Sequence, residues 1–229
     1  MCPPAELLKR DRSHLGRLLT DAQWARLHGI ASVQHHPAAG LAVYRQGEPA
    51  EAAYLLTRGM VELSSTSEAG RRTIVSFLRP GDLFGPFEHE RYLNTACTLS
   101  PVQLYRLPLL ALGELLVSDA RLQLGFLAKA AHDLGRAQQH LIVLGQNRVQ
   151  QRLAAFLVDF VDNGEFWDAQ ARLVTLPMRR SAIADYLAVA PESLARALLG
   201  MEKRGLLRRV PPQGIRIDDL DGLRRQVPR

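Results

Sequence analysis

The chain has 229 residues, of which 47% are hydrophobic and 23% are charged, and its formal net charge is +6. This length is typical of one or two domains, and the hydrophobic share is sufficient for a buried core. The longest apolar run, PLLALGELLV, is far shorter than the roughly 18 to 20 residues of a membrane-crossing helix, and the polar N-terminus is unlike a secretory signal. We therefore expect a cytoplasmic protein without a membrane partner.

The positive charge is concentrated near the C-terminus. From Asp168 to Arg229 there are 12 Lys and Arg residues and 7 Asp and Glu residues, so this last quarter carries +5 of the net +6. A basic terminal module is typical of proteins that bind nucleic acid.

The N-terminal part of the chain predicts helices followed by a β-roll. Thr20 and Gln23 have the spacing of a capping box ahead of the helical run WARLHGI. Between residues 32 and 107, short apolar or alternating runs such as LAVYR, MVELSS and TIVSFL follow one another. Glycines stand between these runs at positions Gly40, Gly47, Gly59, Gly70 and Gly81. This pattern predicts an antiparallel roll or barrel of about eight strands.

A long helix is expected next, with Ser118 as its N-cap and its end near Leu144. Leu127, Leu134 and Leu141 recur every seven residues, and Leu144 lies beside the same stripe. Such a repeat predicts a coiled-coil seam between two copies of the chain. The alternative is a helix that lies on the core of its own domain. A rod of about 39 Å is too long for a small roll to cover, which favours homodimerisation.

The sequence Gly145-Gln146-Asn147 interrupts this helix and predicts a hinge. A further helix is expected from about 148 to 162, closed by a C-cap at Asn163-Gly164. We therefore predict three parts: a β-roll sensor domain with N-terminal helices at 1–117, a dimerisation helix at 118–145, and a C-terminal domain at 146–229.

Two short helical patterns lie close together in IADYLAVAPESLARALLGMEKRGLL, residues 183–207. The connection is short, and Pro191 suits the first turn of a new helix. The segment LLRRVPPQGIRI then predicts two short strands around a PPQG turn. Together these patterns predict a winged helix-turn-helix with a recognition helix at 191–204.

The outer face of the recognition helix carries side chains suited to reading bases: Glu192, Ala195 and Arg196. Arginine can donate two hydrogen bonds to guanine, and glutamate can accept one from cytosine or hold the arginine in register. The alternative is an ordinary surface ion pair between residues four apart. Contacts with DNA phosphates are expected from Arg179, Arg180, Ser181, Ser193 and Lys203.

With these parts in this order, the chain resembles the cyclic-AMP receptor protein / fumarate-nitrate regulator superfamily of bacterial transcription regulators. The resemblance is carried by YRQGEPAEAAYLLTRGMVEL, RRTIVSFLRPGDLFG, QQRLAAFLVDF and LPMRRSAIADYLAVAPESLARALLGMEKRGLL, which together span most of the chain. The last segment is most similar to the branch that controls nitrogen fixation and anaerobic respiration in response to oxygen or nitric oxide.

This resemblance implies an α+β fold and a homodimer that binds a palindromic site in double-stranded DNA with TG-A half-sites. It also implies RNA polymerase as a partner. Ala195 stands where this branch usually has serine before the arginine, and Ala190 stands where it usually has a serine or threonine cap, so the exact half-site is left open.

The sensor part departs from the members that bind cyclic AMP. Those members carry a Gly-Glu pair and an Arg-Ser-Ala run, whereas this chain has Gly85-Pro86 and Asn94-Thr95-Ala96. Arg91 is the nearby cation that could contact a cyclic phosphate. The alternative interpretation is a solvent-exposed loop residue. The two cysteines, Cys2 and Cys97, do not form the cysteine cluster of the iron–sulfur sensors. We therefore expect an effector other than cyclic AMP or an iron–sulfur cluster, or none.

Other chemical roles for the chain have less support from its residues. His35 and His36 are adjacent, with His14, His28 and His89 elsewhere, and imidazole is a haem or metal ligand. Neighbouring residues on a strand point to opposite faces, so this pair does not easily share one ion. Cys97 as a redox switch is the weaker alternative, because a cysteine among strand residues is usually buried and inert.

Motifs of hydrolases, metalloproteases and nucleotide-binding loops are absent from the sequence, so we expect no catalysis and no cofactor. Three alternatives to an effector-controlled DNA regulator stay open. They are a haem-based gas sensor that acts through protein contacts, a constitutive regulator, and a cyclic-nucleotide-responsive regulator with an atypical pocket.

Overall fold

The computed structural model describes Leu15 and residues 18–85, 87–146 and 148–227 of the chain. The chain divides into two compact units, Met1–Gly135 and Arg136–Arg229. Five residues used in the predictions above lie outside the described residues: Cys2, His14, Pro86, Asn147 and Arg229.

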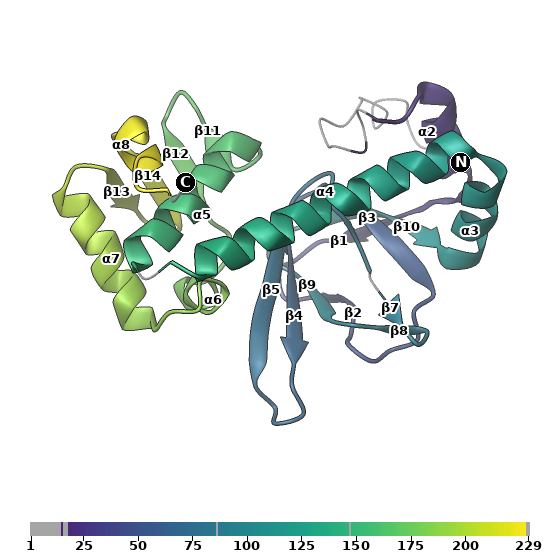
Figure 1. Ribbon diagram of the computed structural model, residues 1–229, viewed down its shortest axis with the longest axis horizontal. Coiled ribbons are helices and arrows are strands. Elements are labelled where there is room, and N and C mark those ends of the chain that lie inside the picture. Colours follow the sequence, from purple (N-terminus) through teal and green to yellow (C-terminus); the bar gives the residue numbers. More distant parts are fainter. Residues whose placement is uncertain (1–14, 16–17, 86, 147, 228–229) are drawn as a thin grey trace. The chain divides into compact units, whose positions relative to one another are not determined.

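The first unit is built around an antiparallel β-roll (Figure 1). Its strands are β1 (Ser32–His36), β2 (Ala42–Tyr44), β3 (Ala52–Arg58), β4 (Val61–Thr66), β5 (Arg72–Leu78), β6 (Leu83–Phe84), β7 (Phe87–Glu88), β8 (Arg91–Tyr92), β9 (Thr95–Thr98) and β10 (Val102–Pro108). One sheet has the order β1-β10-β3-β6, a second has the order β2-β9-β4-β5, and β7 pairs with β8. Side chains from both large sheets, such as Leu56 and Leu63, share one buried core. The predicted antiparallel roll is therefore confirmed, with more strands than the eight expected.

The turn between β3 and β4 shows why glycine recurs between the strands. Gly59 has a φ of +85°, and a Cβ atom at this position would lie 2.2 Å from the carbonyl oxygen of Pro101. Positive φ values also occur at the other four glycines predicted to lie in turns, Gly40, Gly47, Gly70 and Gly81. Glycine is the residue that adopts this conformation without strain, so the predicted turn positions are confirmed.

Two helices, α2 (Asp21–Ile30) and α3 (Leu109–Ser118), pack against β10 of the roll. The long helix α4 (Ala120–Leu144) follows α3. The predicted capping box is confirmed, because the Gln23 amide donates to Thr20 Oγ1 and the Thr20 amide donates to Gln23 Oε1. α2, α3 and the start of α4 bury leucines such as Leu27 and Leu112 in a second apolar core.

Asp119, and not Ser118, caps the start of α4. Ser118 is the last residue of α3, and its hydroxyl donates to the carbonyl of Leu115. Asp119 Oδ1 accepts from the Leu122 amide at 2.9 Å, and Asp119 Oδ2 accepts from Arg26 at 2.8 Å. The bond from Leu122 is the largest cause of a lowered pKa at Asp119. The predicted N-cap at Ser118 is therefore wrong, because residues 109–118 form a helix of their own.

The second unit begins with the end of α4 and continues through a small helical domain with a sheet. Its elements are α5 (Val149–Asn163), β11 (Trp167–Asp168), β12 (Leu173–Thr175), α6 (Arg180–Tyr186), α7 (Pro191–Lys203), β13 (Leu207–Val210), β14 (Gly214–Ile217) and α8 (Leu220–Arg224). The sheet has the order β11-β12-β14-β13. The predicted C-cap of α5 is confirmed, with Gly164 in the left-handed conformation.

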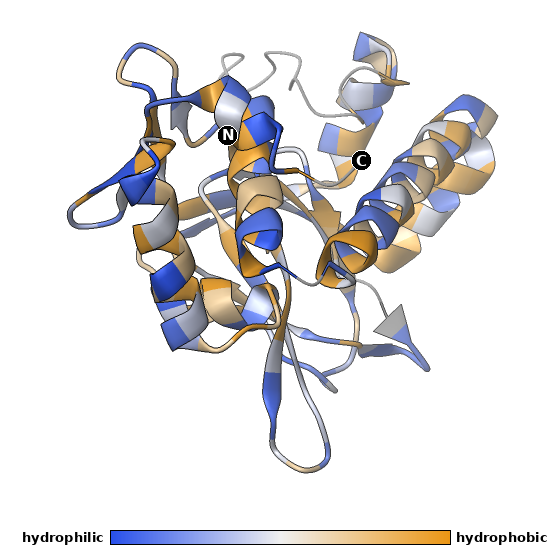
Figure 2. Ribbon diagram, turned by 60° about the vertical axis from the view of Figure 1, so that its left-hand side comes forward, coloured by the Kyte–Doolittle hydropathy of each residue, from blue (hydrophilic) through white to orange (hydrophobic). Residues whose placement is uncertain are grey.

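The core of the second unit forms where α5 packs against α7 and α8. Leu153, Phe156, Leu157 and Phe160 lie on the buried side of α5. The long helices carry hydrophobic and hydrophilic residues on different sides (Figure 2). None of the helices in the described residues combines the length and apolar character needed to cross a membrane.

Candidate DNA interface

α6 and α7 form the predicted helix-turn-helix, followed by the predicted wing of β13 and β14. The turn between the helices contains Ala188 with a φ of 51°, and the Val189 amide donates to the Ala184 carbonyl at 2.9 Å. Pro191 stands at the start of α7 as the sequence predicted. Leu194, Ala197, Leu198 and Met201 are buried on one side of α7. Its opposite side is consequently exposed to solvent.

The three side chains predicted to read bases lie on this exposed side of α7. Glu192, Ala195 and Arg196 are all exposed. Arg196 Nη2 donates to Ser193 Oγ at 3.1 Å. The Arg196 guanidinium is therefore hydrogen-bonded to the Ser193 hydroxyl. The sequence had suggested the Glu192 carboxylate as the group that holds this arginine in register. The bond orients the fork of Arg196 along the outer row of the helix.

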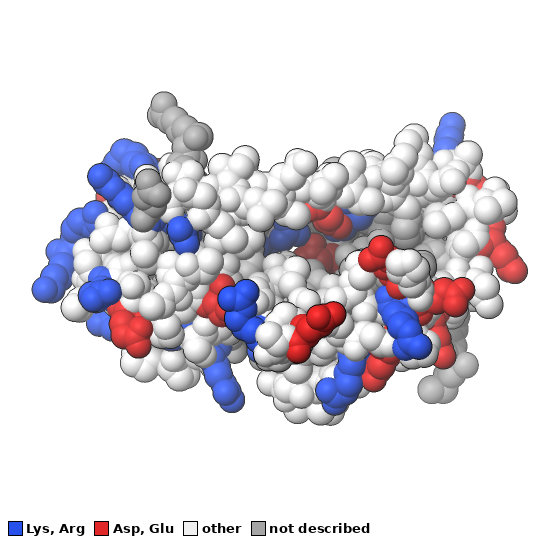
Figure 3. Space-filling model, turned by 60° about the horizontal axis from the view of Figure 1, so that its bottom comes forward, with Lys and Arg blue, Asp and Glu red and all other residues white. Residues whose placement is uncertain are grey.

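The residues predicted to contact phosphates are not equally accessible. Arg179, Ser181 and Lys203 are exposed, whereas Arg180 is half-buried. Burial lowers the pKa of Arg180, and the charge of Arg209 lowers it further. Arg180 is thus less accessible than Arg179 and Ser181, which are open to a ligand. Basic side chains gather over the outer edge of this unit (Figure 3).

An ion pair that was not predicted from the sequence joins α7 to the wing. Glu202 accepts three hydrogen bonds from Arg209, from the backbone amide at 3.1 Å, from Nε at 3.0 Å and from Nη2 at 2.7 Å. These bonds, with the backbone bond the largest cause, lower the pKa of Glu202. The pair fixes β13 against the C-terminal end of the recognition helix. Its sequence signal was weak, since opposite charges seven residues apart across a turn are common.

A second group of contacts holds the turn of the helix-turn-helix against the end of α4. Arg152 on α5 donates from Nε to the Gln146 carbonyl at 2.9 Å. Arg152 Nη1 donates to the Leu187 carbonyl at 2.9 Å and to the Ala188 carbonyl at 3.1 Å. The predicted hinge region is therefore bridged by one arginine to the turn that precedes the recognition helix.

His140 supports the same connection from α4. Its ring stacks on the ring of Tyr186, with a centroid separation of 4.0 Å and an interplanar angle of 9°. Burial lowers the pKa of His140, against the opposing effects of a backbone hydrogen bond at Tyr186 and the charge of Asp159. The last turns of α4 and the end of α6 are thus in direct contact.

Most of the leucines predicted to form a dimer seam are solvent-exposed in the single chain. Leu127, Leu134 and Leu141 are 65%, 60% and 67% exposed. Leu124, which was not predicted to belong to the seam, is 63% exposed on the same helix. Leu144 is half-buried and thus less exposed than the other leucines predicted to form the seam. We call Leu124, Leu127, Leu134 and Leu141 the leucine row.

The interior of the roll is filled by stacked aromatic side chains. The rings of Tyr44 and Tyr92 lie 3.9 Å apart, and Tyr54 and Phe84 pack beside them. The Tyr44 hydroxyl donates to Asn94 Oδ1 at 2.9 Å, and the backbone of Gly85 is also hydrogen-bonded to it. Burial raises the pKa of Tyr44.

Gly85 and Asn94 are two of the positions at which the resemblance places the ribose and phosphate contacts of cyclic AMP. Both are engaged with Tyr44. Asn94 brings no positive charge for a cyclic phosphate, and its amide oxygen is occupied as an acceptor. The structure therefore shows Tyr44 hydrogen-bonded at both positions.

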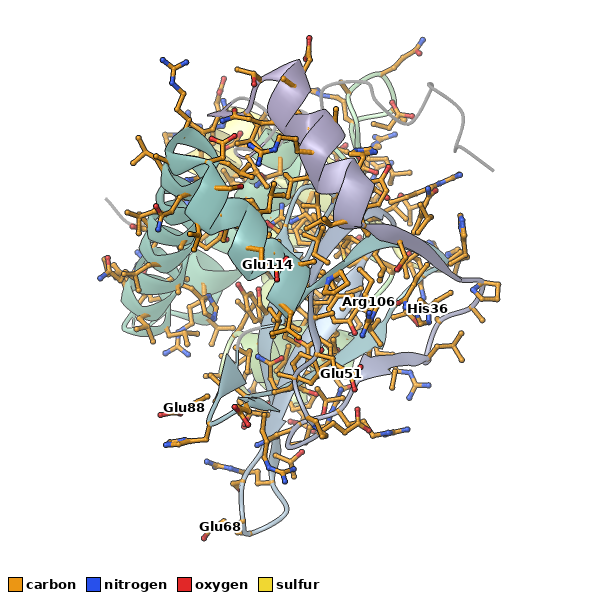
Figure 4. All side chains as sticks on the ribbon, turned by 90° about the vertical axis from the view of Figure 1, so that its right-hand side faces the viewer. His36, Glu51, Glu68, Glu88, Arg106 and Glu114 are labelled. Carbon is orange, nitrogen blue, oxygen red and sulfur yellow. The ribbon has the colours of Figure 1, made fainter. Side chains whose placement is uncertain are left out.

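Among the described residues, the histidines and Cys97 do not gather around a common point. His35 on β1 is exposed and His36 is half-buried, with His36 labelled in Figure 4. The described residues contain no cluster of three His, Cys, Asp or Glu side chains that could hold a metal ion. Cys97 is half-buried, and burial raises the pKa of its thiol, which keeps it protonated and weakly reactive.

Arg106 on β10 contacts the loop before β3. Its Nη2 lies 3.0 Å from Glu51 Oε2, and both side chains are labelled in Figure 4. Glu51 is largely exposed, so this pair is a surface contact of modest strength.

Two protein families match the chain. Residues 34–119 match the cyclic nucleotide-binding domain, and residues 151–226 match the Crp-like helix-turn-helix domain.

Curated relatives cover most of the chain. It is 32% identical to the nitrogen fixation regulation protein FixK of Azorhizobium caulinodans, over 80% of this chain and 74% of the relative. It is 30% identical to the transcriptional activatory protein AadR of Rhodopseudomonas palustris, over 78% and 74% of the two chains.

The solved structure of FixK2 from Bradyrhizobium japonicum is similar, with a TM-score of 0.78 and 25% identity over 87% of this chain and 98% of that one. The relatives are transcription regulators and not enzymes. With a roll, a long helix and a winged helix-turn-helix in the same order, the chain belongs to the cyclic-AMP receptor protein / fumarate-nitrate regulator superfamily of transcription regulators, in its FixK-like branch.

Proposed function

We propose that the protein is a homodimeric regulator that recognises a palindromic DNA site with TG-A half-sites through α7. The observation that carries this proposal is the exposed row of Glu192, Ala195 and Arg196 on α7. The helix buries its apolar side in its own unit and leaves this row free to enter a major groove.

The chemistry of the row fits base edges. The fork of Arg196 can donate to O6 and N7 of one guanine, and Glu192 can accept from N4 of a cytosine. Ala195 offers a methyl group, which suits contact with the methyl group of thymine. Arg179 and Ser181 at the start of α6 are exposed and suited to phosphate contacts that set the register.

The leucine row on α4 supports a dimer. An exposed row of four leucines is unusual on a monomer surface, and a second copy of α4 is the partner that matches its seven-residue repeat. Each leucine contributes about 1.5–3 kcal/mol when fully buried, and less here because part of each side chain is already covered. Two recognition helices in such a dimer would read half-sites about 34 Å apart.

We further propose that the effector, if the roll binds one, is neither cyclic AMP nor an iron–sulfur cluster. Tyr44 engages the Gly85 and Asn94 positions, which supports the first exclusion. The chain has two cysteines, too few for a cluster held by four.

A DNA-binding titration tests the proposal. Duplexes with a symmetric pair of TG-A half-sites are compared with scrambled duplexes of equal composition, at a fixed salt concentration because phosphate contacts are salt-dependent. We expect the Arg196→Ala variant to lose about 1–3 kcal/mol on the palindrome and little on scrambled DNA.

Arg204→Ala is the matched control, because Arg204 is exposed at the C-terminal end of the same helix. It should weaken binding to both duplexes by similar factors. Equal affinity of the unmodified protein for the palindrome and the scrambled duplex would refute sequence-specific recognition.

A further inference from the structure

Lys129 on α4 is the least exposed charged residue in the described part of the chain, at 1%. Its Nζ donates to both carboxylate oxygens of Asp133, at 2.6 and 2.7 Å, and lies 3.6 Å from Asp82 Oδ1. A buried ammonium is tolerated only where carboxylates compensate the loss of water. The position of Lys129 is therefore determined by these two partners.

Asp82 is a fixed point on the roll. It lies in the turn between β5 and β6, and its carbonyl accepts from the Leu56 amide at 3.0 Å. The neighbouring Gly81 amide donates to the Leu56 carbonyl at 2.7 Å, and Asp82 Oδ2 accepts from the Arg79 amide at 2.9 Å. Because Gly81 and Asp82 are both hydrogen-bonded to Leu56 on β3, the contact of Lys129 with Asp82 connects α4 to the β-sheet of the roll.

This connection also sets the rotation of α4 about its own axis. Lys129 stands two residues after Leu127 and five before Leu134, which places it about 200° and 140° around the helix from them. When Lys129 faces Asp82, Leu127 and Leu134 are turned away from the roll, in agreement with their exposure of 65% and 60%. Leu122 at the start of α4 is buried in the second apolar core, so Lys129 adds a polar contact to the packing that orients the helix.

The connection needs no bound small molecule. Lys129, Asp82 and Asp133 all belong to the chain, and the contact is made while Tyr44 fills the interior of the roll. Lysine suits this role because its ammonium is a compact charge with three donors, able to lie between two carboxylates.

We propose that Lys129 is a positioning residue that holds α4 in its DNA-binding rotation by an internal ion pair, without an effector in the roll. This inference rests on the proposed function, because it explains how the leucine row and the two recognition helices would be presented to a palindrome. It identifies the contact between α4 and the Asp82 turn as the point through which the roll controls the dimer.

The test compares Lys129→Met, which keeps an unbranched side chain of similar length, with the exposed Arg121→Met on the same helix. Active protein is first counted by titrating limiting protein with palindrome into excess, both at concentrations well above the dissociation constant, so that misfolded material does not alter that constant. We expect Lys129→Met to raise that constant by about 5- to 150-fold, the usual range of coupling between sites, with Arg121→Met near the unmodified value. A role in stability alone would lower the active fraction and leave the constant unchanged.

Asp82→Asn gives a second route if Lys129→Met folds poorly, because Asp133 still compensates the lysine charge. It should raise the dissociation constant in the same direction, and the double variant should be no weaker than Lys129→Met alone. An unchanged constant for both single variants, measured on active protein, would overturn the proposal while leaving sequence-specific binding intact.

Hydrogen exchange in the free protein separates this inference from the proposed function. The amides of α4 between residues 124 and 134 should exchange faster in Lys129→Met than in Arg121→Met, with or without DNA. If the unmodified protein fails to recognise palindromes, the proposed function is refuted. Hydrogen exchange then still tests whether Lys129 fixes the position of α4. Equal exchange in the two variants would refute that role of Lys129.

Discussion

Replacing Arg152 by methionine should weaken the second unit and its connection to α4. Arg152 donates to the carbonyls of Gln146, Leu187 and Ala188. The first two bonds are part-buried and the third is exposed. A hydrogen bond from a charged donor contributes about 1.5–3 kcal/mol to stability. When the bond is exposed, hydrogen bonds to water compensate for most of its loss. Two bonds at the lower end of this range give a loss of about 3 kcal/mol in the free energy of unfolding.

Urea unfolding followed by tryptophan fluorescence measures this loss. The chain has two tryptophans, Trp24 in the first unit and Trp167 in the second, so a Trp24→Phe background makes Trp167 the reporter of the second unit. Reporting on one unit avoids treating two units as a single transition. Arg148→Met is the matched control, because Arg148 is exposed at the N-cap of the same helix.

Arg152→Met should also relax the preference for half-site spacing. If Arg152 holds the turn of the helix-turn-helix at a fixed place beside the end of α4, its loss allows the recognition helix to reach altered spacings. Palindromes lengthened or shortened by one base pair should then be discriminated less well than by the unmodified protein. The reasoning is refuted if Arg152→Met and Arg148→Met unfold within about 0.5 kcal/mol of each other, the usual spread of surface substitutions.

Three further predictions concern the seam, the wing and pH. Leu134→Glu should raise the dimer dissociation constant by at least about 100-fold, since two leucines leave the seam together, while Leu110→Glu on α3, where the leucine is even more exposed, should not; sedimentation equilibrium decides. Glu202→Gln should weaken binding to specific and scrambled DNA by similar factors, because it frees the wing and leaves the base-reading row intact; a selective loss on the palindrome would contradict this. The second unit should lose stability as the pH falls below 6.5, because burial lowers the pKa of His140 and the unfolded chain then binds the proton more readily, whereas stability is complete above 6.5. His140→Phe should remove this dependence of the Trp167 transition, since His140 is the single histidine after residue 135.

The elements with a strong local signal were predictable from the sequence. The glycines at 40, 47, 59, 70 and 81 all lie in turns with positive φ, and this regularity identified the roll. Pro191 and the spacing of the apolar residues identified the recognition helix, because both depend on the geometry of a single helix. Local rules of this kind do not require knowledge of distant partners.

The start of α4 was misplaced because two adjacent residues are both good caps. Ser118 and Asp119 are equally suited to an N-cap by type. Asp119 takes the role because Gln23 and Arg26 on α2 contact its carboxylate, with Arg26 at 2.8 Å. That interaction joins positions more than 90 residues apart, so the local sequence does not contain it.

The burial of Lys129 also could not be predicted from the local sequence. In a helical pattern a lysine four residues before an aspartate reads as a solvated ion pair. Its burial depends on Asp82, which the fold brings to within 3.6 Å from 47 residues away in the chain. The orientation of Arg196 toward Ser193, and not toward Glu192, likewise follows from side-chain geometry that periodicity does not describe.

The central claim is that two copies of the chain, joined along α4, read the two halves of one symmetric site. Sedimentation velocity with a fluorescent duplex tests it most directly, comparing the palindrome with a duplex that keeps one half-site and scrambles the other. Two chains on the palindrome, bound much more tightly than on the single half-site at equal salt, is the predicted result. One chain per duplex, or equal affinity for both duplexes, would contradict the account.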